Sequence, residues 1–75
     1  MTRPDTTARV RRDDGTTFDS AVIAACVLYD WRATGWPTHC AVNPNEPDRV
    51  ATVGSVAIVT AEDVPVGQMW AYREI

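Results

Sequence analysis

The sequence predicts an all-β fold, a small barrel of five to six short strands. Three observations predict it. Short runs of β-branched and aromatic residues recur along the chain, turn-forming residues separate these runs, and the longest apolar run shows no polar face of the kind an amphipathic helix has. A chain of 75 residues has room for one small core. We expect residues 1–7 to form a flexible leader and residues 8–75 to form a single β domain.

The individual strands are predicted from the turn residues between them. Residues 8–12 and 16–18 are expected to pair as a hairpin around Asp13, Asp14 and Gly15. In a strand over 36–42, Trp36, Cys40 and Val42 would face inward and His39 outward. The remaining prediction is of strands at 49–53, 55–60 and 68–75, a bend at Gly54, a loop at 43–48 and one helical turn at 61–65.

The segment 21–31 decides the fold class, and its pattern allows two interpretations. As a helix, Asp19 or Ser20 would cap its start, Gly35 would follow its end, and one stripe would hold Val22, Ile23, Cys26 and Val27. Its β-branched and aromatic content, and the absence of Glu, Lys, Gln and Met, favour a strand. The alternative fold is therefore α+β, with a helix at about 20–33 packed on an antiparallel sheet.

The layout of residues 8–75 resembles an SH3-like barrel. The resemblance lies in an opening hairpin, a long strand with a shorter partner, and the turn at 62–65 before a terminal strand. It implies recognition of a protein or peptide. The composition, with no lysine and abundant Ala, Val, Thr and Asp, is similar to that of short accessory proteins of actinobacteria and their phages. That similarity implies a modulator or inhibitor of a host protein, located in the host cytoplasm.

The charge distribution disfavours nucleic acid as a partner. The net charge is −3, of which residues 1–12 contribute +3 and residues 13–75 contribute −6. Only Arg9, Arg11 and Arg12 in the N-terminal arm could attract a phosphate backbone. In a strand, Arg9 and Arg11 would share one face and Arg12 would lie on the other. The longest apolar run is too short to span a bilayer, and no signal-like segment is seen, so we expect no membrane partner and a cytoplasmic location.

Few residues could carry catalysis or hold a metal. The soft metal ligands are Cys26, His39 and Cys40, fewer than the four that a structural zinc site needs. We expect both cysteines to be small buried side chains, with a disulfide between them only if their strands pair. The one histidine and the acidic pairs in predicted turns do not form a recognisable catalytic set. We therefore expect no enzyme activity, no metal and no cofactor.

The aromatic residues are the best candidates for function. Tyr29 and Trp31 lie two residues apart, as do Trp70 and Tyr72, so in strands each pair would project from one face. Trp and Tyr dominate the energetics of protein interfaces. With Trp36, and with Asn45 and Glu46 in the 43–48 loop, they predict a non-enzymatic protein-binding module. The alternatives are a structural subunit of a homo-oligomer or virion-type assembly, and a nucleic-acid-associated protein that uses its arginine arm.

Overall fold

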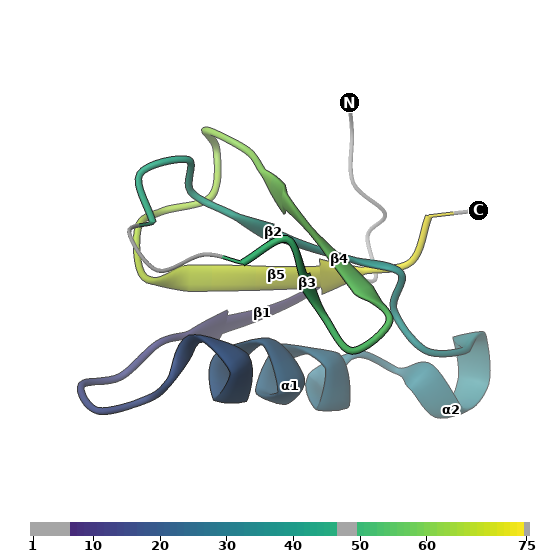
Figure 1. Cartoon of the computed structure of the whole chain (residues 1–75). Coiled ribbons are helices and arrows are strands. Elements are labelled where there is room, and N and C mark those ends of the chain that lie inside the picture. The colour runs from purple at the N-terminus through teal and green to yellow at the C-terminus, as the bar shows by residue number, and fades with distance from the viewer. Residues whose placement is uncertain (1–6, 47–49, 75) are drawn as a thin grey trace.

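The fold is α+β, and the all-β prediction is wrong. The computed structural model describes residues 7–46 and 50–74, so most of the predicted leader lies outside the described residues. A five-stranded mixed sheet lies against one helix, with a second, short helix beyond its end (Figure 1). The elements in chain order are β1 (Ala8–Arg11), α1 (Phe18–Leu28), α2 (Trp31–Thr34), β2 (His39–Val42), β3 (Thr52–Val53), β4 (Val56–Thr60) and β5 (Gln68–Tyr72).

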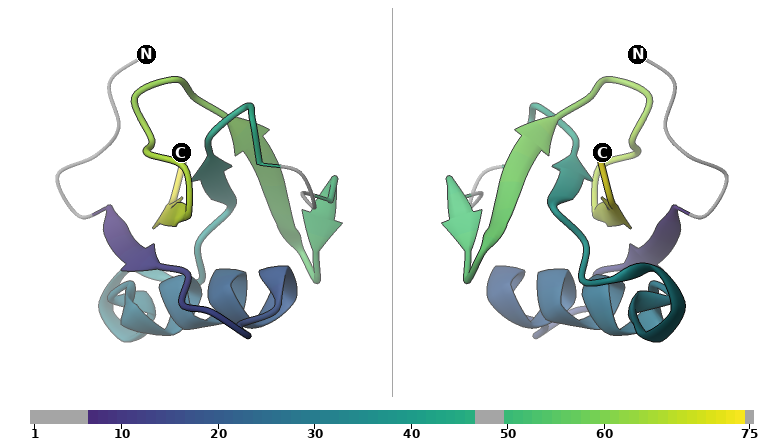
Figure 2. Two further views of the ribbon diagram at one scale, coloured as in Figure 1. Left: turned by 90° about the vertical axis from the view of Figure 1, so that its left-hand side faces the viewer. Right: turned by 90° about the vertical axis from the view of Figure 1, so that its right-hand side faces the viewer.

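The sheet is open and does not close into the predicted SH3-like barrel. Its strand order is β1-β5-β2-β4-β3, with β1 and β3 at the two edges. Strands β2 and β4 are parallel, and the other three pairs are antiparallel. The alternative of an α+β fold was therefore correct in class, but its antiparallel sheet was not. The sheet arches over α1, so that both of its edges approach the helix (Figure 2).

The segment 21–31 is mostly helix because local capping and the sheet both favour that conformation. Thr17 caps α1, since its Oγ1 accepts a hydrogen bond from the backbone N–H of Ser20 at 3.1 Å. Asp19 lies in the first turn, where a negative charge interacts favourably with the helix dipole. The predicted cap, Asp19 or Ser20, was thus placed too late. The return strand at 16–18 was also wrong, because Thr17 caps the helix and Phe18 is its first residue.

The helix carries two apolar stripes on opposite sides. The inner stripe is buried and consists of Phe18, Ala21, Val22, Ala25 and Cys26. The outer stripe is exposed and has the same helical spacing, with Ser20, Ile23, Ala24, Val27 and Leu28. The absence of a polar face from this segment favoured a strand, and the reason for that absence is that the exposed side of the helix is also apolar. The predicted stripe of Val22, Ile23, Cys26 and Val27 is therefore divided, with Val22 and Cys26 facing inward and Ile23 and Val27 facing solvent.

The inner stripe packs against alternate residues of the sheet. Cys40 and Val42 of β2 and Met69 and Ala71 of β5 face α1 and are fully buried. On the opposite face, the fully buried Val64 covers Ala41 and Tyr72. The predicted alternation of Cys40 and Val42 against His39 is confirmed, but Trp36 is 39% exposed and does not face inward. Each fully buried aliphatic side chain contributes about 1.5–3 kcal/mol.

The other predicted elements are partly confirmed. Strands lie within the predicted ranges 8–12, 36–42, 49–53, 55–60 and 68–75, although each is shorter than predicted. Gly54 has a φ of +59° in the turn between β3 and β4, as a sharp bend there requires. Residues 61–65 form turns and no helix. In the described part of the chain, no helix is long and apolar enough to cross a membrane.

The fold predicts that Val22 stabilises the protein far more than an exposed valine does. Val22→Ala should lower the free energy of unfolding by about 2 kcal/mol, less a few tenths for the higher helix propensity of alanine. Val66→Ala, the same change at a residue that is 63% exposed, should change it by less than about 0.5 kcal/mol. Chemical denaturation followed by circular dichroism measures both. Equal effects of the two substitutions would contradict the packing of α1 on the sheet.

Candidate protein-binding face

The outer stripe of α1 continues into α2 and forms an apolar surface. Its large side chains are Ile23, Val27, Leu28, Trp31 and Trp36, with exposed fractions between 37% and 66%. With Ala24 and Ser20 between them, these residues define the α1–α2 face. From Ser20 to Tyr29 the sequence contains no charged residue. Charged residues beside it are Asp19 at one end of α1, and Asp30, Arg32 and Arg73 near the other.

Two tryptophans shape the end of this face nearest α2. The rings of Trp31 and Trp36 meet edge to face, with centroids 5.9 Å apart and planes inclined by 64°. The guanidinium of Arg32 lies 5.2 Å from the centroid of the Trp31 ring. Trp36 lines two open depressions, one of about 570 Å³ toward α2 and one of about 230 Å³ toward the β3–β4 turn. The smaller is lined mainly by apolar residues: Val22, Ile23, Cys26, Trp36, Val53, Gly54, Ser55 and Val56.

The backbone around Trp36 is held firmly against the end of β5. Arg73 Nη1 donates a hydrogen bond to the Trp36 carbonyl at 2.7 Å. Gly35 has a φ of +94°, and a Cβ there would lie 3.2 Å from the same nitrogen, so glycine is needed at this position. Pro37, which follows Trp36, is fully buried, and the N–H of Thr38 donates to the Tyr72 carbonyl at 3.1 Å. Trp36 is therefore exposed on a rigid support.

The predicted pair Tyr29 and Trp31 does not share a strand face. Tyr29 ends α1 and is only 4% exposed, whereas Trp31 begins α2 on the surface. The reason is that the helix ends before Tyr29, and the non-helical backbone at Tyr29 and Asp30 separates α1 from α2, so the two side chains belong to different elements. Of this pair, Trp31 alone lies on the α1–α2 face.

The pair Trp70 and Tyr72 does share a face, on the side of the sheet away from α1. Tyr72 is 6% exposed and stacks on His39, with ring centroids 5.4 Å apart. Trp70 is half-buried, and the guanidinium of Arg9 lies 4.2 Å from its ring centroid. The four rings of the two pairs therefore do not gather in one patch, because the pairs lie on opposite sides of the sheet.

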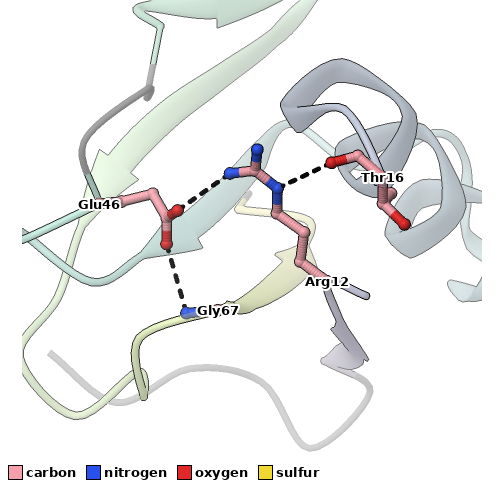
Figure 3. A network of polar contacts seen from close by, with 4 residues as sticks. All are labelled: Arg12, Thr16, Glu46 and Gly67. Carbon is pink, nitrogen blue, oxygen red and sulfur yellow. Dashed lines mark hydrogen bonds and ion pairs between the residues drawn. The ribbon is translucent and has the colours of Figure 1, made fainter. Parts of the chain in front are cut away.

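Glu46 of the predicted recognition loop is part of the folded core, while Asp48 lies outside the described residues. Asn45 is exposed, but Glu46 is 6% exposed and pairs with Arg12, whose Nη1 lies 3.0 Å from Glu46 Oε1. Arg12 Nε donates to the Thr16 carbonyl at 3.0 Å, and Glu46 Oε2 accepts from the N–H of Gly67 at 3.3 Å (Figure 3). This network joins the β1–α1 connection, the chain that follows β2 and the residue that precedes β5.

The same network separates Arg12 from the other two arginines of the predicted phosphate-binding arm. The guanidinium of Arg12 is held by Glu46 and Thr16 and lies 5.9 Å from the Phe18 ring centroid. Arg9 and Arg11 share the sheet face away from α1, as predicted, since they stand opposite Trp70 and Gln68 in the register of β1 and β5. The structure does not bring the three predicted phosphate contacts together.

A third depression, of about 350 Å³, lies on the sheet side opposite α1 and is lined in part by His39, Tyr72 and Glu74. His39 Nδ1 lies 2.7 Å from Thr38 Oγ1, and His39 Nε2 lies 3.7 Å from Glu74 Oε2. The order of these groups resembles a hydroxyl–imidazole–carboxylate triad. However, Thr38 Oγ1 also accepts the N–H of Glu74 at 2.8 Å, so this hydroxyl links the start of β2 to the chain after β5. These contacts hold the two chain segments together at this end of the sheet.

The two cysteines are unpaired and buried, as predicted for small apolar side chains. Burial raises the pKa of Cys40 to about 12, an effect that the nearby Cys26 increases and a backbone hydrogen bond from Trp70 slightly opposes. Burial also raises the pKa of Cys26. Within the two described ranges, His, Cys, Asp and Glu side chains form no group of three that could hold a metal ion.

The surface residues that the sequence analysis missed are Ile23, Val27 and Leu28. Their signal was present in the sequence as a second apolar stripe with helical spacing. It was not used because the segment was interpreted as a strand.

Removing the Glu46 carboxylate should destabilise the fold. Glu46→Ala leaves the largely buried Arg12 guanidinium and the N–H of Gly67 without this acceptor, which should cost about 2 kcal/mol. Asn45→Ala, at the exposed neighbouring position, should cost less than about 0.5 kcal/mol. Urea denaturation measures both, and a Glu46→Ala protein as stable as the Asn45→Ala protein would refute a structural role for the network.

The buried thiols should not react in the folded protein. Both have a raised pKa, so the reactive thiolate is scarce at pH 8, and Ellman's reagent should label neither until the chain unfolds. The pKa of each thiol is higher in the folded than in the unfolded chain. The unfolded chain therefore loses its thiol protons first, and stability should fall as the pH rises from about 8.5 toward 12. Rapid labelling of the native protein would contradict the burial of the cysteines.

The chain matches no protein-family model, no curated protein and no solved structure. Among the described residues, the α1–α2 face holds five of the seven large apolar side chains that are exposed.

Proposed function

We propose that the chain is a non-enzymatic protein-binding module that uses the α1–α2 face. The observation that carries the proposal is the outer stripe of α1. A helix that is apolar on all sides is normally covered on all sides, because exposed apolar area costs about 25 cal/mol per Å². Here the sheet covers only the inner stripe, and Ile23, Val27 and Leu28 are each more than half exposed.

The tryptophans support a protein as the bound molecule. Trp31 and Trp36 offer large apolar areas with N–H groups, and tryptophan is enriched among the residues that dominate interface energies. Arg73 and Gly35 hold the backbone at Trp36, so little conformational entropy is lost when this residue is covered. Contiguous apolar patches with polar residues at their edge typically mark such interfaces.

The α1–α2 face does not favour the nucleic-acid alternative. Arg32 and Arg73 are the basic side chains that lie beside it among the described residues, and Asp30 is next to Arg32 whereas Arg73 is bonded to the Trp36 carbonyl. Phosphate recognition draws on several cationic groups, which this face lacks. The suggestion that the partner is a host protein comes from composition alone, and the proposal does not depend on it.

The proposal predicts that position 28 contacts another protein molecule in the cell. A photo-crosslinking amino acid at Leu28 should form a covalent protein adduct on irradiation, whether the partner is another protein or a second copy. The same residue at Val66, which is equally exposed but lies on the β4–β5 connection, should form none. Gel mobility and mass spectrometry of the adduct measure the outcome. Irradiation that yields no adduct at position 28, or equal yields at both positions, would overturn the proposal.

A further inference from the structure

We propose that the occupant of the α1–α2 face is a second copy of this chain, with the two α1 helices packed antiparallel about a two-fold axis. This inference rests on the proposed function and names its partner. In a two-fold dimer the same patch serves both copies, so it must be complementary to itself. The outer stripe of α1 meets this condition in its side-chain sizes and charges.

The sizes of the side chains along the stripe are self-complementary. The part of the outer stripe from Ser20 to Val27 has its middle between Ile23 and Ala24, and an antiparallel pairing centred there sets position 23 of one copy opposite position 24 of the other. Position 27 then faces position 20. Each large residue, Ile23 or Val27, therefore meets a small one, Ala24 or Ser20. Large residues facing small ones let two helices interdigitate closely.

The charges also permit a second copy. The chain has a net charge of −3, so two copies repel each other across most of their surfaces. The stripe from Ser20 to Leu28 carries no charge, which removes this repulsion from the centre of the contact. At its ends, this register sets Asp19 of one copy opposite Leu28 of the other, so the carboxylates lie at the edge of the contact and outside its uncharged centre. The two helix dipoles oppose each other, which is favourable.

The apolar face supplies five large, partly exposed side chains to such a dimer. A stable interface of standard size buries about 800 Å² per partner, or about a sixth of the 4741 Å² surface described for this chain. The outer stripe would form the centre of that area. Trp31 and Trp36 would extend it beyond the C-terminal end of α1, where α2 continues the same side of the molecule (Figure 1).

Sedimentation equilibrium of the full chain tests the inference. The wild-type protein should form dimers in a concentration-dependent manner. Val27→Asp should weaken the dimer by more than about tenfold, because it buries a carboxylate with no partner, whereas Val66→Asp should leave it unchanged. Ala24→Leu should also weaken it by more than about tenfold, since a larger side chain blocks close approach, whereas the exposed Ala51→Leu should not. A non-specific hydrophobic association would instead be strengthened by Ala24→Leu.

Engineered cysteines test the orientation of the helices. Under mild oxidation Ala24→Cys should form an intermolecular disulfide, because the two positions lie beside the axis, and Ser20→Cys should not. A parallel pair would join two copies at position 20 as well. A monomer at all concentrations, a dimer unaffected by Val27→Asp, or efficient linkage at position 20 would each overturn the inference. A monomer that still crosslinks to a different protein through position 28 would overturn it and leave the proposed function intact.

Discussion

The packing of the inner stripe of α1 against the sheet is the contact on which the rest of the structure depends. It buries Val22 and Cys26 from the helix against Cys40 and Val42 of β2 and Met69 of β5. In a chain of this size the core is small, so a few such side chains supply much of the stability. The arch of the sheet follows the helix, and the strand order places β5 and β2, the most buried strands, over its centre.

The polar residues of the chain serve this packing more than they serve recognition. Arg12 and Glu46, which lie 34 positions apart in the sequence, form an ion pair that fixes three connections at one end of the sheet. At the other end, Thr38 and Arg73 join the start of β2 to the chain that follows β5. Buried charged groups need partners, and a small domain has few side chains from which to supply them. The charged side chains of Arg12, Glu46 and Arg73 therefore already form contacts within the chain.

The uncovered side of α1 connects the fold with the proposed function. The sheet covers the inner stripe of the helix, and the outer stripe has the same spacing and a similar apolar character. The hydrophobic effect that drives α1 onto the sheet also acts on Ile23, Val27 and Leu28, which residues 7–46 and 50–74 leave more than half exposed. Association with a second copy would place α1 between two layers. A helix apolar on all sides is stable in that position.

The sequence by itself determined the approximate positions of the five strands that form, though not the absence of strands at 16–18 and 21–31. It also determined the bend at Gly54, the opposite faces of Cys40 and His39, and the burial of both cysteines. These features depend on local turn chemistry and on the alternation of side chains in a strand, which neighbouring residues specify. Only the tertiary structure decided that 18–28 is a helix, that the sheet is mixed and open, and that Glu46 pairs with Arg12. A run that is apolar at nearly every position fits the period of a strand and of a helix equally well. Contacts with residues distant in sequence therefore select its conformation, and they also determine which of its sides remains in water.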